Sequence, residues 1–254
     1  MYQRAYFPME YLYVSQGYGE ASSSHKLGYA IDFSGEDKGR DNVYAPFECK
    51  VSKIYKPKNT NVSATTIWLT STKKVLASNG YYGYLTMSIT HPIEIMNMKV
   101  GMKFKQGDYL FKEGNTGNAT GYHIHIELAT GTYANWVKRK KGTYTEYVIS
   151  NGVKLEDYLF LRESTIVLNE EYKGYVYDFK KESELTYVIR NVPSEPLLIH
   201  SEANYKKSNV IGGLKNGKEV IRFYNKNGLS YIYHYGKLGY VASNYLYKMW
   251  YNKW

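Results

Sequence analysis

Several features are missing from the 254-residue sequence, and each absence narrows what the protein can be. There is a single cysteine, Cys49, so no disulfide framework can form within one chain. No apolar run approaches the ~20 residues that a membrane-spanning helix needs. The N-terminus has no basic segment followed by an apolar core, and long helical patterns are absent. We therefore expect a mainly β protein without a signal peptide and without membrane insertion.

Charge does not point to a nucleic-acid-binding arm. The 33 Lys and Arg residues exceed the 23 Asp and Glu residues, which gives a formal net charge of +10. The excess is divided evenly between residues 1–165 and 166–254, and the only basic run, Lys138 to Lys141, is predicted to be a solvated loop. A spread positive charge suits association with anionic polymers in general, nucleic acid among them, so it decides little about the partner. We predict that nucleic acid is not a partner.

The secondary structure is predicted to be strands separated by turns. Turn signals include Asn79-Gly80 and the segment 115–117, while residues 131–165 are less regular and favour a connector with one short helix over 155–161. Thirty tyrosines suit pleated surfaces. The candidate strands are 43–55, 65–72, 83–91, 109–113 and 122–129.

The segment 116–128 contains the most informative pattern. His123 and His125 alternate with isoleucines in an extended run, so both imidazoles and Glu127 point to one face of a strand. Two imidazoles roughly 6–7 Å apart can act on one metal-bound water molecule. Alone, a His-x-His pair is equally typical of an ordinary strand. Further histidines and an aspartate in the first half of the chain favour a metal site.

Three further residues in the first half supply those companions. Asp32 lies within the apolar run Tyr29-Ala-Ile-Asp-Phe33, where a carboxylate is costly unless it is paired or binds a metal. His25 ends a small polar loop just before this run. His91 precedes Pro92, which cannot continue a central strand, so His91 is expected at a strand end. By contrast, His200 and His234 have no such neighbours and are predicted to be surface or packing residues.

Four histidines and one buried aspartate suit a catalytic zinc site. Such a site takes three protein ligands of the histidine and carboxylate type and leaves one position open. The metal acidifies water and polarises a carbonyl oxygen, and a nearby histidine can transfer the proton. A nucleophilic cysteine is the rival chemistry, but the surroundings of Cys49 are those of an ordinary strand residue.

In order and spacing, these motifs resemble the lysostaphin-type (LytM-like) zinc metallopeptidases, which cleave peptides in bacterial peptidoglycan. The resemblance covers roughly residues 10–130. It implies one zinc ion per chain held by His25, Asp32 and His125, with His91 and His123 acting as catalytic residues on water and the transition state. The matching segments are Ser15-Gln-Gly-Tyr-Gly19, His25…Asp32, Tyr44-Ala-Pro-Phe47, Gly83…His91, Val100-Gly…Asp108 and Gly114-Asn-Thr-Gly117…His125.

One departure concerns the first motif. The family commonly has three residues between its histidine and aspartate, whereas six separate His25 from Asp32. Either the loop bulges and returns the aspartate to the metal, or the ligand differs. Asp37 and Asp41 are the weaker substitutes, and we retain Asp32 because its apolar context buries it.

The last third resembles bacterial SH3-type domains, which many wall hydrolases use for binding peptidoglycan. Short strands with Gly or Asn turns follow one another from residue 196, and Gly239-Tyr-Val-Ala-Ser-Asn-Tyr-Leu246 is the most specific part. We therefore expect an antiparallel-sheet catalytic domain with a metal groove over 1–135, a connector over 136–165, and a small SH3-like β-barrel over 166–254.

Together these observations predict a peptidoglycan-degrading zinc metalloendopeptidase, monomeric, and made without a signal peptide. A wall-lytic domain of this kind suggests a bacteriophage endolysin, made in the host cytoplasm and released by a separate pore, or a lysin carried on a virion. The alternatives are a catalytically inactive homologue that serves as a wall-binding module, and a basic surface protein that binds other polyanions. The intact histidines favour the enzyme.

Overall fold

The structure is a computed structural model that describes residues 2–19, 22, 24–36, 40–58, 64–95, 97–117 and 119–249. These residues form strands and three short 3-10 helices, at Glu182–Leu185 (η1), Lys207–Asn209 (η2) and Ser243–Tyr245 (η3). The mainly β prediction is therefore confirmed. In the described part of the chain, no helix combines the length and the apolar character needed for crossing a membrane.

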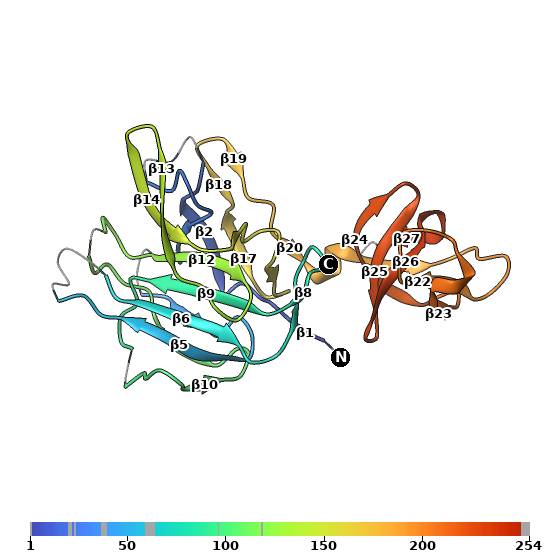
Figure 1. Cartoon of the computed structure of the whole chain (residues 1–254), viewed down its shortest axis with the longest axis horizontal. Coiled ribbons are helices and arrows are strands. Elements are labelled where there is room, and N and C mark those ends of the chain that lie inside the picture. The colour runs from blue at the N-terminus through green and yellow to red at the C-terminus, as the bar shows by residue number, and fades with distance from the viewer. Residues whose placement is uncertain are drawn as a thin grey trace.

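A large sheet organises the first two thirds of the chain (Figure 1). Its strands follow the order β10-β5-β6-β9-β12-β3-β2-β17, and β15 also pairs with β12. Asp32 lies in the central strand β3 and His125 in β12, while His91 directly follows β9 and His123 directly precedes β12. The bounds are β2 Tyr11–Gln16, β3 Ile31–Ser34, β5 Cys49–Tyr55, β6 Thr66–Ser71, β9 Leu85–Thr90, β10 Lys103–Phe104, β12 Ile124–Thr130, β15 Gly152–Val153 and β17 Ile166–Asn169.

Shorter pairings surround this sheet. They join β1 (Gln3–Arg4), β7 (Val75–Leu76) and β8 (Tyr82–Gly83), then β4 (Asn42–Tyr44) with β11 (Tyr109–Lys112), β13 (Trp136–Lys141) with β14 (Tyr144–Ile149), β16 (Phe160–Leu161) with β20 (Lys180–Lys181), and β18 (Glu171–Tyr172) with β19 (Tyr175–Val176).

Two details of the predicted elements were wrong. The strand expected over 43–55 is divided into β4 and β5, because the segment from Ala45 to Glu48 turns at Pro46, which has no N–H for a ladder. The helix expected over 155–161 is a turn, in which the N–H of Leu159 donates to the carbonyl of Leu155, followed by β16.

Strand alternation separates the two faces of the large sheet. One face is the core, and the strands β3, β6, β9 and β12 contribute side chains that are at most about 1% exposed. Each such side chain stabilises the fold by about 1.5–3 kcal/mol. The opposite face is polar in its centre. The core residues from these strands are Ile31, Phe33, Ile67, Leu69, Met87, Ile89, Ile124, Ile126 and Leu128.

The C-terminal part is a second sheet with its own core, centred on Ile199, Ile232 and Val241. Seven strands follow the order β23-β22-β26-β25-β24-β21-β27. Among the described residues no pairing joins the terminal strands β23 and β27, so a closed barrel is not found. The bounds are β21 Thr186–Ile189, β22 Leu197–His200, β23 Val210–Leu214, β24 Glu219–Lys226, β25 Leu229–His234, β26 Lys237–Ala242 and β27 Leu246–Lys248.

Residues 166–181 lie between these two parts in sequence but associate with the first. β17 pairs with β2 in parallel, and Tyr177 and Phe179 belong to the first core. The second sheet begins only at Thr186. The predicted domain boundary at residue 166 stays a prediction. The last strand that pairs within the first part ends at Lys181, and the first strand of the second sheet begins at Thr186.

Aromatic and charged contacts join the two parts. Arg4 forms two hydrogen bonds with Glu182, at 2.8 and 2.9 Å, and its guanidinium lies 5.1 Å from the ring centre of Tyr233. The Tyr2 N–H donates to the Tyr233 hydroxyl at 3.2 Å. These contacts place the second sheet against the β1-β7-β8 edge.

Replacing Gly17 tests whether residues 166–181 stabilise the first part. A Cβ at Gly17 would lie 1.7 Å from the Tyr177 hydroxyl oxygen, so Gly17→Ala must displace a fully buried ring. We expect a loss of about 1–3 kcal/mol of stability, measured by thermal unfolding. Gly121→Ala is the control, because nothing lies within 4 Å of its Cβ position. Equal melting temperatures for the two variants would contradict the packing described.

Candidate metal centre

His25 is held by its backbone on both sides. Its N–H donates to Ser22 Oγ at 2.9 Å, and its carbonyl accepts from the N–H of Gly19 at 2.9 Å. Ser22 Oγ also accepts from Gln16 Nε2, at 3.2 Å. The side chain is buried, with 7% of it exposed, and points toward Asp32. A short polar loop therefore fixes the position of one predicted ligand.

Asp32 lies in the middle of β3, where the sequence predicts a buried strand. Its neighbours Ile31 and Phe33 point into the core, so its carboxylate points to the polar face. Across the sheet it is paired with His125 on β12 and with Gln16 on β2. Register thus places the carboxylate beside the His-x-His motif.

The two histidines of that motif lie on the same face, as alternation predicts. His125 Nδ1 donates to Asp32 Oδ1 at 2.9 Å, while His123 Nε2 lies 3.9 Å from Asp32 Oδ2. His123 Nδ1 is 2.9 Å from the carbonyl oxygen of Gly121. Since a carbonyl only accepts, His123 Nδ1 carries its proton and Nε2 faces the carboxylate.

His91 follows the last residue of β9 and has a left-handed backbone, with φ of 68°. Such a conformation is costly for a residue other than glycine and is common at functional sites. Its Nδ1 is 2.6 Å from the carbonyl oxygen of Thr116, so this nitrogen also carries a proton. The ring centres of His91 and His123 are 4.4 Å apart.

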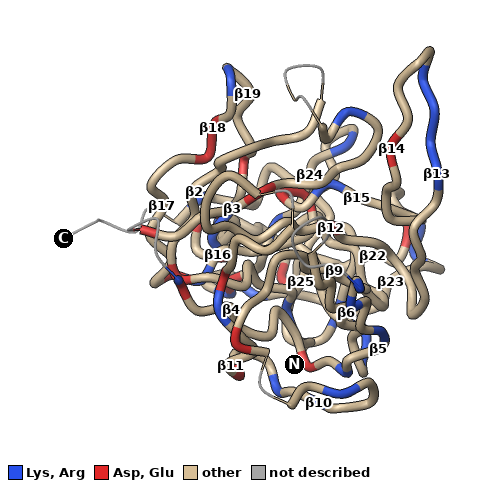
Figure 2. Tube along the Cα trace, turned by 90° about the vertical axis from the view of Figure 1, so that its left-hand side faces the viewer, with Lys and Arg blue, Asp and Glu red and all other residues tan. Residues whose placement is uncertain are grey.

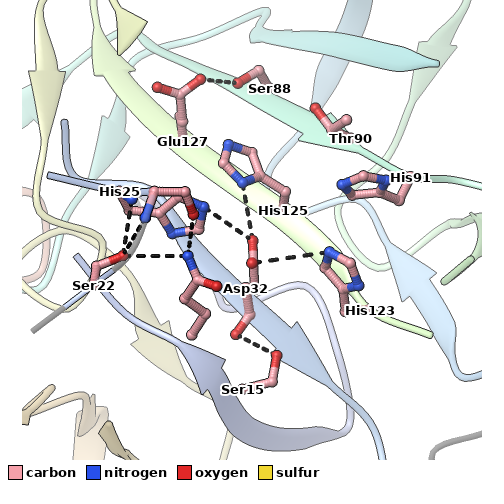
Figure 3. Close-up of polar contacts among 12 residues, drawn as sticks. Ser15, Ser22, His25, Asp32, Ser88, Thr90, His91, His123, His125 and Glu127 are labelled. Atoms are coloured by element: carbon pink, nitrogen blue, oxygen red, sulfur yellow. Dashed lines mark hydrogen bonds and ion pairs between the residues drawn. The ribbon is translucent and has the colours of Figure 1, made fainter. Parts of the chain in front are cut away.

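All five predicted site residues are therefore brought together (Figure 3). The rings of His25, His123 and His125 surround the Asp32 carboxylate, and His91 lies beyond His123 and His125. His25 Nε2 is 3.6 Å from Asp32 Oδ1. One potential ligand atom from each of His25, Asp32 and His125 lies within 4.8 Å of the others. Their roles stay a prediction, since proximity alone assigns none.

Burial and mutual charge determine the protonation of the cluster. Burial lowers the pKa of His25 and of His91 to about 4, so both rings are neutral near pH 7. Burial alone would raise the pKa of Asp32, but the hydrogen bond from His125 and the neighbouring imidazoles lower it to about 2. For His125 the burial effect is outweighed by Asp32, which raises its pKa.

This chemistry fits a divalent metal ion. Neutral imidazoles and an ionised carboxylate are the forms that bind one, and His25, Asp32 and His125 supply a two-histidine, one-carboxylate set. His91 and His123 are not in the ligand group and remain beside it.

The hairpin β13–β14 supports the loop that follows His25. The sequence analysis did not predict this support. Glu146 Oε2 accepts from the Leu27 N–H at 2.7 Å, and Arg139 Nη1 donates to the Leu27 carbonyl at 2.8 Å. The Tyr144 hydroxyl donates to the Ser24 carbonyl at 2.5 Å. At the base of the hairpin, Glu127 Oε1 accepts from the Ile149 N–H at 2.7 Å.

The six residues between His25 and Asp32 do not keep the two side chains apart, because His25 Nε2 lies 3.6 Å from Asp32 Oδ1. The extra residues form a loop that the hairpin holds, and the chain still returns Asp32 to His25. Of the weaker substitutes, Asp37 lies outside the described residues. Asp41 lies against Gly35, where a Cβ would meet its Oδ2 at 1.5 Å, and it is not part of the ligand group.

The basic run Lys138–Lys141 is in strand β13 rather than in a loop. Figure 2 shows it along one strand of the projecting hairpin. All four side chains are exposed, which agrees with the predicted solvation. The Arg139 guanidinium nevertheless holds the His25 loop, so the run is partly structural.

The remaining candidates lie outside the cluster. His200 is 4% exposed with Nδ1 2.7 Å from Asn209 Oδ1, and His234 Nδ1 is 2.7 Å from the Glu219 carbonyl oxygen, so both have packing or surface roles. Burial raises the pKa of the Cys49 thiol to about 12. A thiol with that pKa is protonated near pH 7, which disfavours a cysteine nucleophile.

Comparisons with known proteins give partial matches. No protein-family profile matches the chain. Over 138 residues it is 34% identical to Morphogenesis protein 1 of Bacillus phage B103, an alignment that covers 54% of this chain and 35% of that protein. The chain thus spans about a third of the length of this relative.

Solved structures give weaker likenesses. The antimicrobial peptidase lysostaphin from Staphylococcus simulans is 15% identical, with a TM-score of 0.40, and the match covers 95% of this chain and 91% of lysostaphin. A zinc-containing peptidase from Vibrio cholerae is 18% identical, with a TM-score of 0.36, over 51% of this chain and 37% of that one. At these sequence identities and TM-scores, the likenesses assign no function to this chain.

Removing Glu146 tests the loop support. Glu146→Ala leaves the Leu27 N–H without its acceptor, so His25 should lose its fixed position and zinc affinity should fall about tenfold or more, measured by competition with a chelating dye. Glu146→Gln keeps one acceptor oxygen and should lose much less. Unchanged affinity in Glu146→Ala would show that the hairpin does not position the ligand.

Proposed function

We propose that the protein is a zinc metalloendopeptidase that hydrolyses peptide bonds in the cross-links or stem of bacterial peptidoglycan. One observation carries the proposal: His25, Asp32 and His125 converge on one point with His91 and His123 beside them. That arrangement provides both a metal-binding set and separate groups for proton transfer. The order of the motifs, which resembles that of the lysostaphin-type peptidases, supports peptidoglycan as the substrate.

Within this proposal, His25, Asp32 and His125 hold one zinc ion per chain. The bound ion would supply a Lewis acid that polarises a peptide carbonyl and acidifies water. The chain itself orients the proton-transfer groups. Because His91 and His123 each donate Nδ1–H to a backbone carbonyl, both tautomers are fixed and each Nε2 can accept a proton.

The two catalytic histidines would act as a pair. Their ring centres are 4.4 Å apart, so the Nε2 that takes the proton of the attacking water can then pass that same proton to the departing amine, with the second ring beside it. His91 is neutral near pH 7, which leaves its lone pair available for this role. Partial burial of both rings limits competing solvent.

For the C-terminal sheet we propose a wall-binding role. Its separate core and the SH3-like motif near 239–246 support an attached module, which would raise the effective concentration of the enzyme at an insoluble substrate. The similarity to a phage morphogenesis protein favours a lysin carried on a virion over a free endolysin. The substrate would then be a bacterial cell wall. The amino-acid composition of the chain favours a Gram-positive host.

The alternative function is an inactive homologue that only binds the wall. It predicts binding without hydrolysis, with or without metal. The enzyme is favoured because all five residues of the site are present and face one another, including the strained His91.

Wall clearing with matched variants tests the proposal. Purified walls should lose turbidity with the intact protein, stop doing so with a chelator, and resume with zinc. His125→Ala should lose the metal. His91→Ala and His123→Ala should retain it but lose about 10²–10⁴-fold in rate, because positioned acid–base groups contribute that much. Tyr109→Ala, at an exposed residue of the first part outside the cluster, is the control and should behave as wild type.

Wall binding by the intact protein without any release of peptide fragments, at saturating zinc, would instead establish the inactive homologue. Full activity in His91→Ala or His123→Ala would show that their roles are misassigned.

A further inference from the structure

A row of directly paired residues links the metal centre to an aromatic cluster on the same face of the large sheet. His125 on β12 is paired with Thr90 on β9, Thr90 with Thr66 on β6, and Thr66 with Tyr55 on β5. Adjacent strands are about 4.7–4.9 Å apart, so Tyr55 lies about 14 Å from His125. The threonine hydroxyls are 2.9 Å apart, and Thr66 is buried beneath the surface.

The end of this row is an aromatic corner, formed by Tyr55 and Trp136. Their ring centres are 5.5 Å apart at an interplanar angle of 77°. Trp136 in turn packs at 5.6 Å against Trp68, which is only 1% exposed and therefore acts as support. Tyr55 is 41% exposed, and Trp136 is partly exposed. The corner thus presents two rings, nearly perpendicular, to solvent.

A polar pair borders the aromatic corner. Lys53 Nζ lies 5.2 Å from the ring centre of Trp68 and 5.7 Å from that of Trp136, and it donates to Asn135 Oδ1 at 3.0 Å. Aromatic faces with hydrogen-bonding groups at their rim suit a ligand that has apolar C–H faces and polar edges. A sugar ring has this character.

The distance from His125 agrees with that ligand. An extended peptide spans at most about 3.3–3.6 Å per residue, so about four residues bridge 14 Å. In peptidoglycan, a stem peptide of about that length separates its cross-link from the amino sugar that carries it. A cross-link placed at the metal centre would therefore bring the amino sugar to Tyr55.

We propose that the aromatic corner is a subsite for an amino-sugar ring of the glycan strand, which makes the enzyme prefer substrates that keep their sugars. This inference rests on the proposed function for the position of the scissile bond. Tyr55 is the residue to change, because Trp136 also packs against the buried Trp68. Tyr109 is a matched control, since it is equally exposed at 41% and has a ring contact with Tyr44.

Hydrolysis of two matched substrates tests the preference. Cross-linked muropeptides that carry their disaccharides are compared with the same peptides after the sugars are removed. Tyr55→Ala should lower kcat/KM about threefold to tenfold on the sugar-bearing substrate only, the scale of one ring contact. Tyr55→Phe and Tyr109→Ala should retain the wild-type ratio. An equal fall on both substrates, or none on either, would overturn the subsite.

Binding measured without turnover separates this inference from the proposed function. A disaccharide-tetrapeptide is titrated into chelator-treated protein, with tryptophan fluorescence as the readout. Weaker binding by Tyr55→Ala but not by Tyr109→Ala supports the subsite, even if no wall is hydrolysed. Equal binding by both variants overturns it, even if the wild-type protein hydrolyses walls.

Discussion

The charge of Asp32 is the constraint on which the candidate site depends. Its carboxylate lies in a central strand at 8% exposure, where an ionised group without compensation would be strongly destabilising. Three imidazoles provide that compensation, with His125 donating at 2.9 Å. The lowered pKa of Asp32 shows that its neighbours more than offset the burial cost. A divalent cation beside the carboxylate would add to this compensation.

Three separate devices bring the imidazoles to this carboxylate. Strand register aligns His125 with Asp32, alternation along the chain brings His123 to the same face, and a polar loop held by Glu146 directs His25. His91 itself has the left-handed backbone after β9 and lies beside His123. The opposite face of the same strands is the hydrophobic core, which fixes the register because a slip of one residue would exchange the faces. Core packing and site geometry are therefore properties of the same strands.

Sequence reasoning predicted those parts that depend on alternation. His123, His125 and Glu127 could be placed on one face of a strand from period two alone, and Pro92 marked the end of β9. The grouping of Asp32 with them depended on its apolar context and on the family resemblance. The hairpin β13–β14 was predicted as an irregular connector, because its exposed basic strand has neither a clear apolar alternation nor a partner visible in sequence. The contact between Glu146 and Leu27 spans 119 residues, and no local pattern reveals such a pairing.

The C-terminal sheet illustrates a different limit. Its short strands and Gly or Asn turns were readable, but whether they close into a barrel depends on edge pairing, which the strands themselves do not encode. The packing of Tyr177 against Gly17 is likewise a long-range fit that composition cannot reveal.

X-ray absorption at the zinc edge tests whether His25, Asp32 and His125 are the ligands of a bound zinc ion. Protein loaded with one equivalent of zinc should show a single site with two imidazole nitrogens and a carboxylate oxygen from the chain, and Asp32→Ala should change that ligand set. Zinc bound with an unchanged ligand set in Asp32→Ala would contradict this ligand assignment. So would a wild-type protein that took up no zinc.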